Sequence, residues 1–202
     1  MHNETSKLHK RALVLSYFTV GYNLVEFIIS IVVGALSGSI ALIGFGLDSF
    51  VESLSGGIMI WRFSKHGKLS EQQEEIIERR AEKFVGYTFI ILAGYILYES
   101  INNLINEEIP EPSLLGIIIA VLSIIIMPIL FCKKYQTGKA INSRSLVADS
   151  KETLACSFLS VALLIGLGAN YLFGFWQSDP IVGILISAFL IREGFETLKG
   201  DE

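Results

Sequence analysis

Two carboxylates stand in the middle of a long apolar stretch of this sequence. Asp48 and Glu52 fall within residues 40–61, a run that supplies the roughly 20 residues a helix needs to cross a bilayer. Positions four apart lie about 40° apart around a helix, so the two side chains share one face. An isolated charge at that depth costs about 3 kcal/mol or more, so the pair must face a protein interior, a watery cavity or a cation. We interpret this pair as part of a cation-binding site.

A second apolar segment, residues 145–168, carries a similar group of polar side chains. With Asp149 as the origin, Glu152 lies at about 300° and Cys156 at about 340° around a helix, so the three share one face. Carboxylate oxygens combined with a thiolate suit a divalent transition ion such as Zn, Fe, Co or Cd, whereas a Mg or Ca site would not include a thiol. The predicted metal ligands are Asp48, Glu52, Glu152 and Cys156.

Three further polar residues are candidates for additional ligands or gating groups. Asp149 stands nearest the start of its segment, so it suits a gate or a supporting role as well as ligation. Glu26 and Asn23 interrupt the first apolar segment, where they indicate either a hydrogen-bonded helix contact or an extra carboxylate on the cation path. Lys151 is the candidate counter-ion for one carboxylate, although it points about 100° away from Glu152 on a helix.

Composition indicates a membrane protein, since the 202-residue chain is 51% hydrophobic over its whole length. The pattern predicts an all-α polytopic protein with six transmembrane helices. We expect an N-terminal tail at 1–11, a transmembrane domain at 12–199 that includes a charged loop at 62–83, and no soluble C-terminal domain. The six predicted spans are 12–33, 40–61, 84–105, 113–131, 145–168 and 181–198.

The basic residues gather on one side of these predicted spans. They occupy the N-terminal tail, the loops after the second and fourth spans and the end of the sixth, with Lys133 and Lys134 assigned to the loop after the fourth. Because basic loops remain inside, both termini are predicted to be cytoplasmic in a protein of the cell membrane. The opposite loops carry only acidic charges, which are Glu107, Glu108, Glu111 and Asp179.

Three segments resemble the cation diffusion facilitator family of divalent-metal transporters: residues 37–52, 145–156 and 179–183. In that family an acidic pair on the second span meets a His/Asp pair on the fifth, and both pairs are four residues apart. By position these are Asp48 with Glu52 and Glu152 with Cys156, so this sequence departs from the family at both positions of the fifth span.

The resemblance implies a homodimeric exporter that exchanges a divalent metal for protons by alternating access. This sequence resembles short family members that lack the usual C-terminal cytoplasmic domain, so dimerisation is expected through the transmembrane helices. The expected cargo is Zn before Fe, Co, Cd or Mn, with no fixed cofactor and no nucleic-acid partner.

Two other functions are open at this point. A proton-coupled exporter of organic cations would have an aromatic-lined cavity, for which the second and fifth spans offer only Phe45, Phe50 and Phe158. A non-transporting membrane interaction protein would tolerate neutral substitutions at Asp48 and Glu52. An enzyme is not expected, because the sequence shows no nucleophile–base pair, phosphate-binding glycine loop or HExxH motif.

Overall fold

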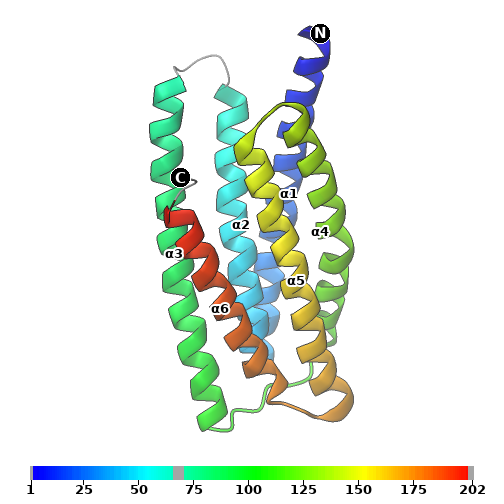
Figure 1. Cartoon of the computed structure of the whole chain (residues 1–202). Coiled ribbons are helices and arrows are strands. Elements are labelled where there is room, and N and C mark those ends of the chain that lie inside the picture. Colours follow the sequence, from blue (N-terminus) through cyan, green and yellow to red (C-terminus); the bar gives the residue numbers. More distant parts are fainter. Residues whose placement is uncertain (1, 66–70, 200–202) are drawn as a thin grey trace.

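The computed structural model describes residues 2–65 and 71–199, which form six α-helices with no β-strand among them (Figure 1). The all-α prediction is thereby confirmed. Residues 66–70 of the predicted loop 62–83 lie outside the described part, and all of its other residues belong to α-helices. The helices are α1 (His2–Ser37), α2 (Ile40–Lys65), α3 (Glu71–Ile105), α4 (Leu114–Ala140), α5 (Arg144–Phe173) and α6 (Ser178–Lys199).

Five of the described helices, α1 to α5, are long and apolar enough to cross a membrane by length and composition. Helix α6 begins with an apolar stretch but carries Arg192, Glu193 and Glu196 towards its C-terminal end. Helix α6 is not among the five. A sixth membrane crossing therefore stays a prediction from the sequence.

The side chains are distributed as in a protein whose surroundings are apolar. Phe18, Ile91, Ile125 and Leu172 are each more than half exposed on the outside of the bundle, whereas many serine, threonine and asparagine side chains are buried inside it. A water-soluble bundle shows the opposite arrangement. In lipid, buried hydroxyl and amide groups join helices by hydrogen bonds, and an apolar exterior faces the acyl chains.

Helix α2 stands at the centre of the bundle. It packs against α1, α3, α5 and α6, while α3 pairs with α6 and α4 pairs with α5 (Figure 1). The helix that carries Asp48 and Glu52 is therefore enclosed by neighbours instead of lipid. The packing also places α5, which carries the second predicted group of ligands, directly beside α2.

The two ends of the bundle differ in what they hold. The first end contains the start of α1 and the α4–α5 turn at 141–143, and α6 runs toward it (Figure 1). We call this the terminal end. The opposite end, which we call the loop end, contains the α1–α2 turn at 38–39, the α3–α4 loop at 106–113 and the α5–α6 turn at 174–177.

The loop end is fastened by the residues at the start of α2 and α6. Ser39 accepts a hydrogen bond from the Leu42 amide at 3.1 Å, which caps α2. The carboxylate of Asp179 accepts a hydrogen bond from the Ser39 hydroxyl and another, at 3.3 Å, from the Ala41 amide. Asp179 stands at the start of its own helix but also satisfies the first turn of α2, where a negative charge is favourable. The contact joins α2 to α6.

Glycines bring α3 and α6 into close contact near the terminal end. A methyl group at Gly194 would lie 3.0 Å from the Gly86 carbonyl oxygen and 3.1 Å from the Phe89 β-carbon. We expect Gly194→Ala to destabilise the protein by about 1–3 kcal/mol, because the added carbon forces two packed backbones apart. A melting temperature measured in detergent should fall. Gly94→Ala on α3 is the matched control, since its added carbon meets nothing within 4 Å, and equal melting temperatures would contradict the prediction.

Candidate functional site

The predicted ligands lie where α2 and α5 pack together. Asp48 and Glu52 on α2 are 5% and 4% exposed, and Cys156 on α5 is 2% exposed. The Cys156 and Asp48 side chains lie close enough to interact electrostatically. Glu152 is half-buried. The structure therefore brings side chains from both predicted groups into one region inside the bundle.

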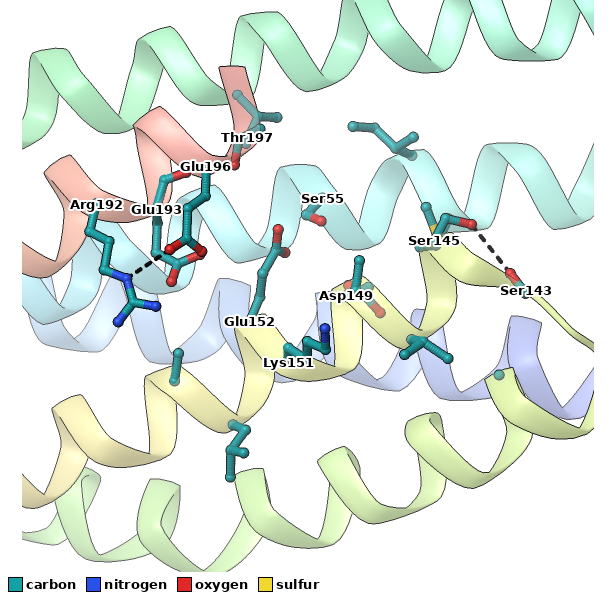
Figure 2. A pocket seen from close by; sticks show the side chains of 18 of the residues that line it. Ser55, Ser143, Ser145, Asp149, Lys151, Glu152, Arg192, Glu193, Glu196 and Thr197 are labelled. Carbon is teal, nitrogen blue, oxygen red and sulfur yellow. Dashed lines mark hydrogen bonds and ion pairs between the residues drawn. The ribbon is translucent and has the colours of Figure 1, made fainter. Parts of the chain in front are cut away.

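A cavity of about 1000 Å³ reaches this region from the terminal end. Asn142 and Ser143 of the α4–α5 turn line its mouth, and Asp149 and Glu152 line it from α5. Figure 2 shows Glu152 reaching from α5 toward Ser55 on α2, while Glu193 and Glu196 project from α6. The cavity is thus lined mainly by α2, α5 and α6, with smaller contributions from α3 and α4, and its acidic side chains come from α5 and α6.

A second, much smaller cavity of about 10 Å³ lies beside the first. Asp48 and Glu52 line it together with Phe89, and its other lining residues are Glu152, Phe189 and Glu193, which also line the large cavity. The small volume holds about one water molecule. The α2 carboxylates are therefore separated from the large cavity by one layer of side chains.

Glu193 is a residue of this region that the sequence analysis missed. It is half-buried on α6 and lines both cavities. Its only signal in the sequence is a pair of charged residues, Arg192 and Glu193, that interrupts the last apolar segment. Glu196, one turn further along α6, is exposed and forms an ion pair with Arg192 at 2.8 Å. Its environment therefore differs from that of Glu193.

The counter-ion of the site differs from the predicted one. Lys151 is exposed, whereas Lys134, which the sequence analysis placed in a cytoplasmic loop, is 0% exposed inside α4. Its ammonium nitrogen lies 2.9 Å from Asp149 Oδ2 and 2.9 Å from Thr153 Oγ1, to which it donates a hydrogen bond. The loop assignment was wrong because α4 continues to Ala140, and the extra turns carry Lys134 into contact with α5. Asp149 is therefore an ion-paired residue.

Glu26 and Asn23 lie on α1 and are both buried. Glu26 accepts hydrogen bonds from the Tyr22 hydroxyl at 2.9 Å and from the Ser49 hydroxyl of α2 at 2.8 Å. Both of its oxygens are thus engaged, and the contact joins α1 to α2. The Asn23 amide is buried with no hydrogen-bond partner within the described chain.

The carboxylates nearest the cavities keep oxygens free, in contrast to Glu26. Glu52 accepts a hydrogen bond from Thr153 through Oε1 at 2.6 Å, while its Oε2 is buried without a hydrogen-bond partner in the described residues. Glu152 Oε2 is also buried and without one there. Among the side chains that the structure describes, no three of His, Cys, Asp or Glu are gathered into a group that could hold a metal ion. The arrangement is one of acceptor atoms near each other in a closed space, without a formed coordination shell.

The sequence profile of the cation efflux transmembrane domain matches residues 16–200. Transmembrane protein 163 of Xenopus laevis is 25% identical over 197 residues, which cover 97% of this chain and 69% of that protein. Magnetosome protein MamB of Paramagnetospirillum magneticum is 25% identical over 171 residues, covering 83% of this chain and 57% of MamB.

An uncharacterized transporter of Methanocaldococcus jannaschii is 26% identical over 178 residues, covering 86% of this chain and 62% of that protein. The chain thus spans between 57% and 69% of the length of these three relatives. All three are similar to it along most of its own length. Because the profile match extends over nearly the whole chain, the protein belongs to the cation efflux, or cation diffusion facilitator, family of divalent-cation transporters.

Proposed function

We propose that this protein exports a divalent transition-metal ion from the cytoplasm in exchange for protons by alternating access. Asp48, Glu52, Glu152 and Cys156 are the proposed ligands. The observation that carries the proposal is a pair of buried α2 carboxylates separated by one layer of side chains from a large open cavity, with Glu52 Oε2 left unpartnered. A buried acceptor without a partner is rare in proteins, and a cation is the partner it suits best.

The path of the ion follows from the two cavities. Glu152 and Glu193 line both cavities, so a cation that moves from the large cavity toward the small one passes these two side chains. It then reaches Asp48 and Glu52. Binding requires the carboxylic acids and the thiol to be deprotonated, so the incoming ion displaces protons. When the site faces the other side, protons compete for the same atoms and release the ion.

The proposed cargo follows from the donor types. Carboxylate oxygens and one thiolate favour Zn, with Fe, Co, Cd and Mn as related candidates. The proposed orientation places the terminal end, where the large cavity opens, in the cytoplasm, together with both termini. The proposed assembly is a homodimer through the membrane helices in the cell membrane.

The experiment is a transport panel in proteoliposomes over Zn, Mn, Fe, Co, Ni and Cd. Wild-type protein should move at least one of these ions at a rate well above that of empty liposomes, and collapsing the proton gradient should slow it. Asp48→Ala should remove this flux, while Glu111→Gln, an exposed carboxylate at the loop end, should not. Absence of flux for all six ions, or flux that ignores the proton gradient, would contradict the proposal.

The same liposomes test export of organic cations as the alternative. A cavity of about 1000 Å³ is large enough for such a molecule, but its aromatic lining is limited to Phe158 and Phe189. Ethidium is a suitable probe because it is a fluorescent aromatic cation. Proton-driven ethidium transport without metal transport would support the alternative.

A further inference from the structure

Lys134 places a positive charge among the buried acidic residues. It is completely buried on α4 and belongs to no part of the proposed ligand set. Its ammonium group forms an ion pair with Asp149 at 2.9 Å and donates to the Thr153 hydroxyl at 2.9 Å. That hydroxyl donates to Glu52 Oε1 at 2.6 Å. A continuous chain of contacts therefore links α4, α5 and α2 and ends on a proposed metal ligand.

We propose that Lys134 is a tethered counter-cation for the empty transporter. It holds Glu52 through Thr153 and, when no metal is bound, balances a buried carboxylate that the returning protons leave ionised. The proposal rests on the proposed transport function and identifies a positioning residue, since Lys134 acts on the ion through other side chains.

The two carboxylate oxygens of Glu52 have different surroundings. Oε1 is turned toward Thr153 and Lys134, while Oε2 is buried without a partner in the described chain, and Glu52 lines the small cavity. An ion bound by Glu52 would therefore share one carboxylate with the relay from Lys134. The ammonium group repels that ion, because two positive charges that are separated only by one hydroxyl and one carboxylate still interact in a poorly hydrated interior.

The same charge favours the return of the empty transporter. Glu52, Asp149 and Glu152 all interact electrostatically with Lys134, so the site without metal retains one fixed positive charge. Moving a buried and unbalanced negative group through a conformational change is unfavourable. Lys134 thus weakens metal binding and accelerates the step that follows metal release.

The nearby lysines do not have this placement. Lys133 precedes Lys134 on α4 and Lys151 lies on α5, and both are exposed. Lys133→Met is accordingly the matched control, because it removes one positive charge from the adjacent position without touching the buried contacts.

The test compares net transport with metal-for-metal exchange in proteoliposomes, using the ion that the wild type moves best. In Lys134→Met we expect the apparent KM for the metal to fall about tenfold and the maximal net rate to fall about tenfold. Exchange, which does not require the empty transporter to return, should stay within about twofold of the wild type. Lys133→Met should match the wild type in all three measurements.

Two further variants distinguish an effect on transport from a loss of the folded structure. Removing Lys134 alone leaves Asp149 charged and unpaired in the interior, which destabilises a protein strongly. The double variant Lys134→Met/Asp149→Asn removes both members of the pair and keeps the net charge of the site, so its apparent KM and net rate should return toward the wild-type values. Thr153→Val keeps the ion pair but breaks the relay to Glu52, so it should shift KM and net rate in the same directions by a smaller factor.

The outcomes separate this inference from the proposed function. Wild-type protein that moves no metal would overturn the proposed function itself. Wild-type protein that moves metal, with the kinetics of Lys134→Met and Thr153→Val equal to those of the wild type, would overturn the role of Lys134. A parallel loss of affinity, net rate and exchange in the double variant and in Thr153→Val would assign Lys134 a structural role only, and would also overturn it.

Discussion

Glu52→Gln is expected to lower the initial rate of metal transport at least about 100-fold while the protein still folds. The substitution replaces the unpartnered oxygen Oε2 by an amide nitrogen, which does not coordinate a cation, and removes one negative charge beside the small cavity. Supporting residues of metal sites alone are worth roughly 10–100-fold in affinity or activity, so a ligand should be worth more.

The remaining oxygen of the glutamine side chain can still accept the hydrogen bond from Thr153, which spans 2.6 Å in the wild type. The packing between α2 and α5 should therefore survive, and a melting temperature in detergent should change by only a few degrees. Metal uptake into proteoliposomes is the measurement, with Glu111→Gln as the control for loss of a carboxylate elsewhere. Uptake within about threefold of the wild type would show that Glu52 does not bind the ion.

Cys156→Asp is expected to change which metal is carried. A thiolate favours Zn and Cd, whereas a carboxylate favours harder ions such as Mn. Because the other proposed ligands are the carboxylates of Asp48, Glu52 and Glu152, an aspartate at position 156 would offer the ion oxygen ligands only. We expect the ratio of Cd transport to Mn transport to fall at least about tenfold.

Competition between Cd and Mn in the same liposomes measures this ratio directly. Cys156→Ser should reduce Cd transport without raising Mn transport, since a hydroxyl is a poor ligand for both. Cys132→Ser is the matched control, because Cys132 is an exposed thiol on α4. A Cd-to-Mn ratio unchanged in Cys156→Asp would remove the thiol from the proposed ligand set.

Local periodicity was sufficient to predict much of the fold and part of the site. Long apolar runs predicted helices, and each predicted segment corresponds to one helix of the structure. The four-residue spacing predicted that Asp48 and Glu52 share a face, and both do line one cavity. These inferences succeed because they depend only on helix geometry and on the cost of exposing charge to lipid.

The positions of Lys134 and Glu193 could not be predicted from local sequence periodicity. A basic run after an apolar segment is typical of a cytoplasmic loop, so the continuation of α4 and the burial of Lys134 depend on contacts with α5 that no local pattern records. Glu193 joins the cavities only because α6 lies beside α2 and α5. The sequence is compatible with two interpretations of Glu26, and its hydrogen bonds to Tyr22 and Ser49 account for its place between α1 and α2.

The fastening of Asp179 to the first turn of α2 constrains how this bundle can rearrange. Any motion that parts α2 from α6 at the loop end must withdraw the carboxylate from Ser39 and Ala41. The amide it leaves behind then needs a replacement acceptor, and water entering the widening gap is the obvious one. Hydration of that gap and separation of the two helices are consequently a single coupled event.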